Sequence, residues 1–174
     1  NPPDIIKFQV YKPETITLNS SNKDFRVDSK SSWSKHKNLF ALYAKAHTPW
    51  EWVEKMVEKC KLHNLPWFAS PFDDTAVDFL EKLHCKAYKL ASPEITDIGL
   101  IEKISKTGKP IVLSTGVASL EDLDLAIKTI RKYHDQFAIL KCTSAYPSPH
   151  EDLNLSAIKL LKKRYKCKVG FSDH

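Results

Sequence analysis

Two lysines lie inside short apolar segments of this sequence. Lys7 stands between Ile6 and Phe8, and Lys89 lies within the segment 87–91. An ammonium group buried in a strand is costly unless it meets an anion. A single such lysine can pair with a carboxylate of the protein or extend to solvent. Two lysines at equivalent strand positions favour a bound phosphate or carboxylate instead.

Polar residues also lie at the ends of the other apolar segments. A serine at such a position more often caps the next helix than binds a ligand. Ser114-Thr115-Gly116 is a stronger signal, because a glycine lets backbone N–H groups approach an anion closely. The polar residues at the predicted strand ends are Lys7, Gln9, Ser70, Lys89, Ser92, Glu94, Ser114, Thr115, Thr143, Ser144, Tyr146, Ser172, Asp173 and His174. Taken alone, His174 fits a metal ligand, a general base or a surface residue, and Glu94 and Tyr146 fit ordinary rim positions.

The segments that carry these residues have the pattern of buried parallel strands. They alternate strictly with longer segments of helical period, which is typical of a parallel sheet joined by crossover helices. The predicted strands are 5–9, 66–70, 87–91, 110–114, 137–141 and 168–171. A doubly wound sheet and a closed barrel both fit this alternation. From the third strand onward, a repeat of roughly 20 to 30 residues and the absence of a glycine-rich turn after any strand favour a (β/α)8 TIM barrel.

Six predicted strands are fewer than the eight of a closed barrel. The sequence also starts inside a strand, without an initiator Met, and stops at Asp173-His174. We therefore expect an incomplete α/β barrel over residues 1–174 that lacks the first and last strand units. Barrel enzymes form their active sites at the carboxyl ends of the strands, where the polar residues named above lie.

Helix faces and helix ends follow the same pattern. One apolar face joins Trp52 to Cys60, and similar faces are expected over 76–83 and 120–130. Ser119 with Asp122 predicts an N-cap, Gly108 a C-terminal stop, and Ser156 a cap of the last helix. The connection from Tyr11 to Lys37 is long and polar, which is typical of a lid or binding loop.

Composition excludes several classes of protein. The net charge is +6 and 42% of residues are apolar, but the lysines are spread among Glu and Asp on helical segments, so nucleic-acid binding is not expected. No segment reaches the roughly 18 consecutive apolar residues of a membrane span. The four cysteines form no CxxC pair, which fits a reducing cytoplasm rather than a disulfide scaffold or a zinc finger.

Six strings together resemble the sialic acid synthase family, in order and across nearly the whole chain. They are Ile-Lys-Phe-Gln at 6–9, Ser-Pro-Phe-Asp at 70–73, Ala-Tyr-Lys-Leu-Ala-Ser-Pro-Glu-Ile-Thr-Asp at 87–97, Gly-Lys-Pro-Ile-Val-Leu-Ser-Thr-Gly at 108–116, Lys-Cys-Thr-Ser-Ala-Tyr-Pro at 141–147 and Gly-Phe-Ser-Asp-His at 170–174. Lys-Cys-Thr-Ser-Ala-Tyr-Pro, together with Ala-His-Thr-Pro-Trp-Glu-Trp at 46–52, is closer to the pseudaminic acid synthase branch than to the N-acetylneuraminate branch. Trp50 and Trp52 in that second string either contact substrate or pack the helix.

The resemblance implies an enzyme that condenses phosphoenolpyruvate with an N-acetylated amino sugar, releasing phosphate and a nine-carbon 2-keto acid. It assigns the phosphate and carboxylate of phosphoenolpyruvate to Lys7, Ser70, Lys89, Ser92, Ser114, Ser144 and Ser172. It places Gln9, Glu94 and Tyr146 at the sugar, with Lys89 and Glu94 as the catalytic candidates. The alternative is a non-catalytic fragment or paralogue that retains only the anion pocket.

The resemblance also implies partners for the chain. A divalent metal, manganese or else magnesium, is expected at His174, where it would polarise the sugar aldehyde. The family's second metal histidine, its first-strand glutamate and its small C-terminal domain are not in this sequence. A homodimer is expected for the full-length protein, and no turnover for this chain alone.

Overall fold

A six-stranded parallel sheet organises the chain. The computed structural model describes residues 3–31 and 33–173, and the strands follow one another in chain order. They are β1 (Ile6–Val10), β2 (Trp67–Pro71), β3 (Tyr88–Leu90), β4 (Ile111–Ser114), β5 (Phe137–Cys142) and β6 (Lys168–Ser172). Each predicted strand is confirmed to within one residue at either end, apart from the shorter β3. Within the described residues, β1 and β6 are the edge strands, so the sheet is an open section of a (β/α) barrel.

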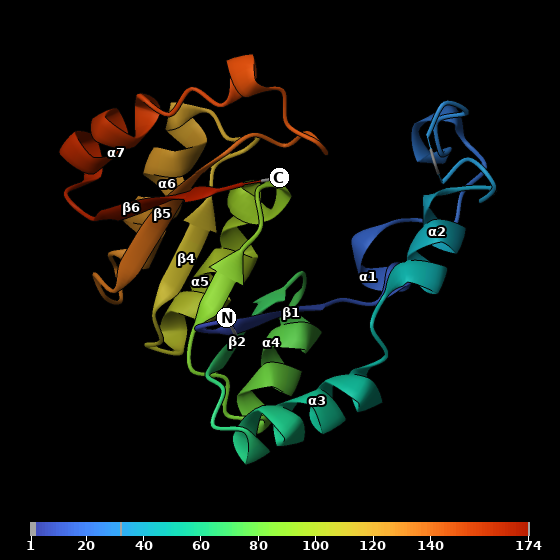
Figure 1. The fold of residues 1–174 in the computed structure, drawn as a ribbon, viewed down its shortest axis with the longest axis horizontal. Coiled ribbons are helices and arrows are strands. Elements are labelled where there is room, and N and C mark those ends of the chain that lie inside the picture. Colours follow the sequence, from blue (N-terminus) through green and yellow to red (C-terminus); the bar gives the residue numbers. More distant parts are fainter. Residues whose placement is uncertain (1–2, 32, 174) are drawn as a thin grey trace.

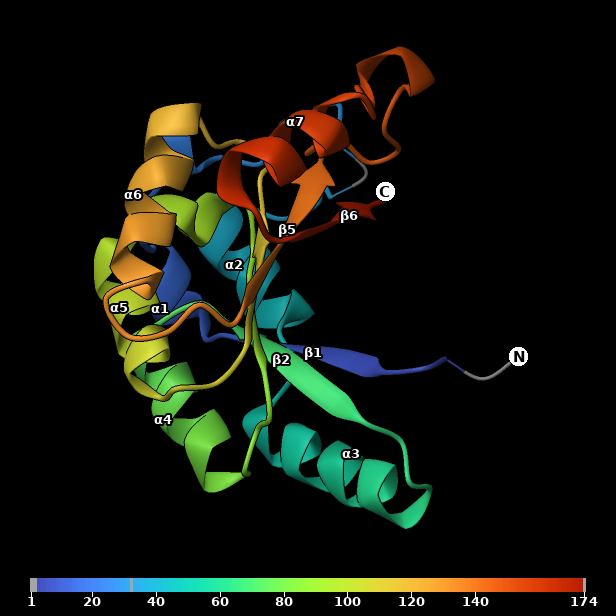
Figure 2. The same ribbon diagram turned by 90° about the vertical axis from the view of Figure 1, so that its left-hand side faces the viewer.

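Helices connect the strands and cover one face of the sheet. The longer ones are α2 (Leu39–Ala46), α3 (Trp50–Leu62), α4 (Asp74–Lys82), α5 (Ile98–Lys106), α6 (Leu120–Ile130) and α7 (Ala157–Tyr165). Shorter turns of helix are α1 (Pro13–Ile16), η1 (Lys23–Phe25), η2 (Pro93–Thr96) and η3 (His150–Asp152). Figure 2 shows α4, α5 and α6 along one side of the strands. In the part of the chain that is described, no helix combines the length and apolarity needed to cross a bilayer.

The core lies between this helical layer and the sheet. Tyr88, Leu90, Ile111, Leu113 and Ile139 are at most 1% exposed, and the register aligns Tyr88 with Ile111 and Leu90 with Leu113. Successive side chains of a strand point to opposite faces. The residue between two core residues therefore points to the other face of the sheet, which is the inner face of the barrel section. Strand alternation thus separates an apolar outer face from an inner face that carries Lys89, Ser70 and Ser114.

The connection from Tyr11 to Lys37 is more structured than its composition indicates. It contains α1 and η1 and leads into α2, and Figure 1 shows this part of the chain projecting to one side of the sheet. Tyr11 anchors its start, with ring centroids 5.5 Å from Phe72 and 6.1 Å from Tyr43. The prediction of a lid or binding loop stays a prediction, and these contacts show that the start of the connection is anchored by aromatic packing.

The two tryptophans near the start of α3 take different positions. Trp50 stacks on Phe79 of α4 at 4.5 Å between centroids, and the Lys12 ammonium lies 4.2 Å from its ring. Trp50 therefore packs helices together. Trp52 is 58% exposed, so its predicted place on the buried face of α3 is wrong; Val53, Val57 and Cys60 form that face.

Two of the three predicted helix ends are confirmed. Ser119 and Asp122 form a reciprocal capping box at α6, and Gly108 follows the C-cap of α5 with φ of 70°. Ser156 occupies the N-cap position of α7 but makes no capping bond with its side chain. Its hydroxyl donates to Asn154 Oδ1 at 2.8 Å instead, so that prediction is right for the position and wrong for the interaction.

These two serines give a matched test of the capping bond. Ser119→Ala removes the acceptor for the Asp122 N–H, at 3.1 Å, and should lower the free energy of unfolding by about 1 kcal/mol. Ser156→Ala should change it by less than about 0.5 kcal/mol, because no helix N–H loses its partner. Urea unfolding followed by circular dichroism measures both. Equal losses in the two variants would contradict the assigned caps.

Candidate functional site

The two strand lysines lie on the inner face but in different surroundings. Lys89, between Tyr88 and Leu90 of β3, is 9% exposed, whereas Lys7 on β1 is exposed. The predicted burial of Lys7 is therefore wrong, because β1 is an edge strand whose inner face is open. Burial lowers the pKa of Lys89, and the nearby charge of Lys7 lowers it further. Neither lysine takes part in an ion pair within the described residues. The charge of Lys7 thus opposes that of Lys89, whereas the charge of Glu94 favours it.

Two buried hydroxyls lie on the same face. Ser70 is the last residue but one of β2 and Ser114 ends β4, and each is 1% exposed. Each directly follows a fully buried outer-face residue, Ala69 or Leu113, so strand alternation turns both hydroxyls inward. Within the described residues, neither Oγ has a hydrogen-bond partner. A buried hydroxyl without a partner costs roughly 1–3 kcal/mol, so these groups are suited to a ligand that accepts hydrogen bonds.

A third hydroxyl, that of Ser92, is held by neighbouring strand ends. Ser92 is 6% exposed; its Oγ accepts the Gly116 N–H at 2.9 Å and donates to Cys142 Sγ at 3.6 Å. Gly116 follows β4 and Cys142 ends β5. The prediction that the Gly116 amide faces an anion is wrong, because this N–H is used by Ser92. Sequence reasoning did not select Cys142, since a cysteine at the end of an apolar strand carries no distinctive signal.

Glu94 is the carboxylate whose charge acts on Lys89. It lies in η2, just after β3, and burial raises its pKa while the charge of Lys89 lowers it. Its Oε2 is buried and has no partner within the described residues. Burial that raises the pKa of a carboxyl group favours its protonated form, and such a shift is common in groups that act as a general acid or base.

The remaining predicted residues lie around this cluster. Gln9 is exposed and aligns with Ser70 across β1 and β2, and Ser172 of β6 aligns with Cys142. Ser144 is exposed and approaches Gly116, whereas Tyr146 is 77% exposed at the rim. The structure therefore brings the residues predicted to bind an anion to one face, with Tyr146 at its margin.

The predicted metal ligand, His174, lies outside the described residues. Within residues 3–31 and 33–173, no group of three His, Cys, Asp or Glu side chains is placed to hold a metal ion. The described residues therefore do not by themselves fit a metal centre, and the chemistry they offer is that of cations and hydroxyl donors.

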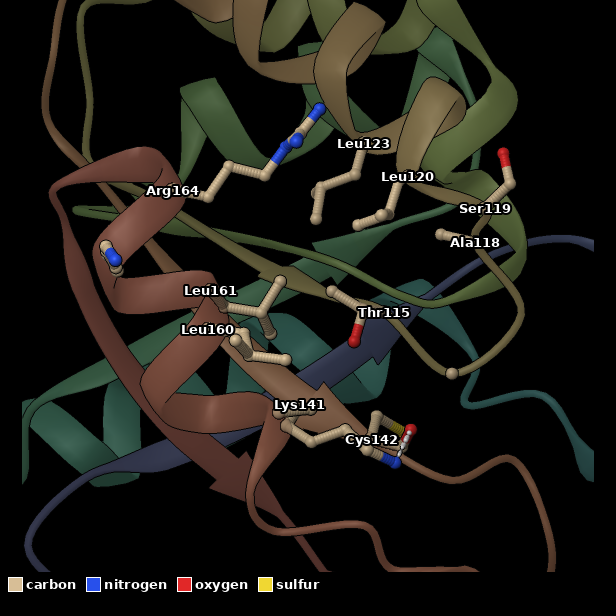
Figure 3. A pocket seen from close by; sticks show the side chains of 13 residues that line it. Thr115, Ala118, Ser119, Leu120, Leu123, Lys141, Cys142, Leu160, Leu161 and Arg164 are labelled. Atoms are coloured by element: carbon tan, nitrogen blue, oxygen red, sulfur yellow. Dashed lines mark hydrogen bonds between the residues drawn. The ribbon is translucent and has the colours of Figure 1, made fainter.

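A separate cavity of about 710 Å³ lies between α6 and α7. Figure 3 shows Leu120 and Leu123 of α6 facing Leu160 and Leu161 of α7 across it. Lys141 lies at its floor and donates to the Cys142 carbonyl and to Thr143 Oγ1, both at 2.9 Å. This cavity is on the helical side of the sheet, and it reaches the candidate site at Gly116 and Cys142, which also line it.

Comparison with known proteins agrees with the observed fold and residues. The model of the NeuB family matches residues 3–174. Pseudaminic acid synthase from Helicobacter pylori is 43% identical over 172 residues, which are 98% of this chain and 50% of that protein. N-acetylneuraminate-9-phosphate synthase from Homo sapiens is 29% identical over 176 residues, 98% of this chain and 47% of that protein.

A solved structure shares the arrangement of the strands and helices. The N-acetylneuraminic acid synthetase from Leptospira borgpetersenii, crystallised with citrate, superposes with a TM-score of 0.83 at 30% identity. The alignment covers 98% of this chain and 54% of that one. The chain thus spans about half the length of the relatives it matches.

The raised pKa of Glu94 predicts a pH-dependent effect on stability. The unfolded chain ionises Glu94 at the usual glutamate pKa, whereas the folded protein resists ionisation, so stability falls as pH rises from that value through the raised pKa. Glu94→Gln removes this loss. Its melting temperature should match that of the wild type near pH 4 and exceed it at pH 7 to 8.

Glu102→Gln is the matched control of opposite sign. The hydrogen bond from Lys106 is the main cause that lowers the pKa of Glu102, so its carboxylate contributes stability above the usual glutamate pKa that is lost as pH falls. This variant should be less stable than the wild type at pH 7. Differential scanning fluorimetry across pH compares the two, and a Glu94→Gln difference that did not vary with pH would contradict the assigned surroundings of Glu94.

Proposed function

The chain belongs to the NeuB family, and from this we propose that the full-length protein condenses phosphoenolpyruvate with an N-acetylated amino sugar. The products are a nine-carbon 2-keto sugar acid and inorganic phosphate. One observation supports this most directly. The ammonium groups of Lys7 and Lys89, which repel each other, lie on the same inner face of the sheet as two buried hydroxyls without a partner within the described residues, those of Ser70 and Ser114.

Phosphoenolpyruvate matches this set of groups in charge. It carries close to three negative charges on a phosphate and a carboxylate. A ligand of that charge would relieve the repulsion between Lys7 and Lys89 and compensate the burial of Lys89. It would also accept hydrogen bonds from the Ser70 and Ser114 hydroxyls. A neutral ligand would leave both lysines without compensation, so a multiply charged anion accounts for the site best.

The bond changes of the proposed reaction assign work to these groups. The C3 methylene carbon of phosphoenolpyruvate attacks the aldehyde carbon of the open-chain sugar, and the aldehyde oxygen takes up a proton. Water adds at C2 and loses a proton, and cleavage of the bond between C2 and the phosphate oxygen leaves the ketone and phosphate. Lys7 and Lys89 hold the charge of the departing phosphate throughout, as preorganised electrostatic stabilisation requires.

Glu94 is the proposed residue for moving a proton or orienting the sugar. Its raised pKa and its position beside Lys89 place a proton-exchanging carboxyl group next to the anion site. Gln9 and Tyr146, which are both exposed at the carboxyl ends of strands, are proposed to face the sugar. The similarity to pseudaminic acid synthase favours a 2,4-diacetamido-2,4,6-trideoxy hexose as acceptor, and N-acetylmannosamine is the alternative.

The metal, the homodimer and the cytoplasmic location stay predictions. Manganese or magnesium at His174 rests on the resemblance of Gly-Phe-Ser-Asp-His to the family's strings. When bound, such an ion would polarise the sugar aldehyde. The described residues contain no group of three His, Cys, Asp or Glu side chains that would complete such a site among themselves.

Replacing Lys89 tests the anion site. Lys89→Met keeps the length of the side chain and removes its charge, and it should weaken phosphoenolpyruvate binding at least about 100-fold, because a desolvated charge partner is lost. Lys141→Met is the control, since Lys141 is also a strand lysine but lies on the helical side of the sheet. Isothermal titration calorimetry on the full-length protein measures both. Unchanged affinity in Lys89→Met would show that the anion site is assigned wrongly.

Product analysis tests the reaction itself. Full-length protein with manganese and phosphoenolpyruvate should release phosphate only when an amino sugar is added, and faster with the 2,4-diacetamido hexose than with N-acetylmannosamine. Mass spectrometry identifies the product, and EDTA should stop the release. Binding of phosphoenolpyruvate without phosphate release from either sugar would favour the non-catalytic alternative.

A further inference from the structure

Gly116 occupies a position where three side chains converge. It follows β4, directly beyond Ser114 and Thr115, and has no positive φ, so its backbone conformation suits any residue. The space around Gly116, however, leaves no room for a side chain. A Cβ built there would overlap Ser144 Oγ and would lie 2.8 Å from Ser92 Oγ and 3.0 Å from Cys142 Sγ. Contacts rather than backbone geometry therefore require a glycine.

The three neighbours of Gly116 come from two other strand ends. Ser92 follows β3, whereas Cys142 ends β5 and Ser144 follows it. Gly116 itself holds Ser92, since its N–H donates to Ser92 Oγ at 2.9 Å. The same hydroxyl donates to Cys142 Sγ, which is 3% exposed, so the contact is shielded from solvent. Because Gly116 has no side chain, the ends of β3, β4 and β5 can approach one another at this position.

We propose that Gly116 is a positioning residue that sets where the Ser92 and Ser144 hydroxyls meet the phosphoenolpyruvate anion. This inference rests on the proposed function above. The Gly116 N–H fixes the oxygen of Ser92, whose O–H would turn from Cys142 Sγ to the anion on binding. The absent Cβ leaves the space beside Ser144 Oγ. A methyl group at this position would push Ser144 outward and strain the bond to Ser92. Gly116 does not touch the substrate in this proposal and acts only through these two hydroxyls.

Gly116→Ala tests the proposal, with Gly99→Ala as its control. Gly99 lies within α5, and a Cβ there would approach only Asp97 Oδ1, at 3.4 Å. In the full-length protein, Gly116→Ala should raise both the Kd and the KM for phosphoenolpyruvate by about tenfold or more, because two hydrogen-bond donors to a charged ligand are displaced. The KM for the amino sugar should change less than about twofold. Gly99→Ala should leave both constants unchanged.

A double variant distinguishes positioning from a general loss of structure. Ser144→Ala removes the atom that the new Cβ would overlap, so Gly116→Ala with Ser144→Ala should fold even where the single variant is unstable. Its Kd for phosphoenolpyruvate should be weaker than that of Ser144→Ala alone, because Ser92 is still displaced. The combined loss should also be smaller than the product of the two single losses, since both act on Ser144.

The outcomes separate this inference from the proposed function. If the wild-type protein binds phosphoenolpyruvate and Gly116→Ala binds it equally well, the positioning role is wrong and the proposed function stands. A double variant equal to Ser144→Ala alone would overturn the positioning of Ser92. Failure of the wild-type protein to bind phosphoenolpyruvate would overturn the proposed function itself, and the inference with it.

Discussion

The alternation of side chains along parallel strands is the constraint on which the rest of this structure depends. Tyr88 and Leu90 are fully buried against the helical layer, and Lys89 between them must point the other way. The same rule turns Ser70 and Ser114 inward beside Ala69 and Leu113. A slip of one residue in the register would place the ammonium group in the apolar core. The core that stabilises the strands therefore also fixes the face on which the polar groups gather.

Two glycines show different physical reasons for the same residue type. Gly108, after the C-cap of α5, has a φ of 70°, and a Cβ there would meet no atom within 4 Å. Its conformation requires a glycine, and its surroundings do not. Gly116 is the reverse case, because its φ is ordinary and its surroundings are filled by Ser92, Cys142 and Ser144. The first serves the end of a helix, and the second serves the arrangement of the candidate site.

The sequence predicted the strands well because each is a short apolar run with clear turn residues on either side. It predicted the helix ends at Ser119 and Gly108 because those rules depend on residues a few positions apart. Its errors concern features that depend on distant parts of the chain. The burial of Lys7 depends on whether another strand covers β1, and the use of the Gly116 amide depends on Ser92, which is 24 positions away. Cys142 was missed because only the assembled strand ends give it a role.

The unequal burial of the two lysines has a consequence for how an anion would bind. Lys7 remains in contact with solvent, so its charge costs little, and it contributes a long-range attraction that salt weakens. Lys89 is desolvated, so it gains most from a direct contact and loses most when that contact is absent. An arriving anion would also reduce the repulsion that Lys7 exerts on Lys89 and so raise the pKa of Lys89. Lys7 on β1 thus attracts the anion over a distance, and Lys89 on β3 contacts it directly. Both roles depend on the alternation that holds the two side chains on the inner face.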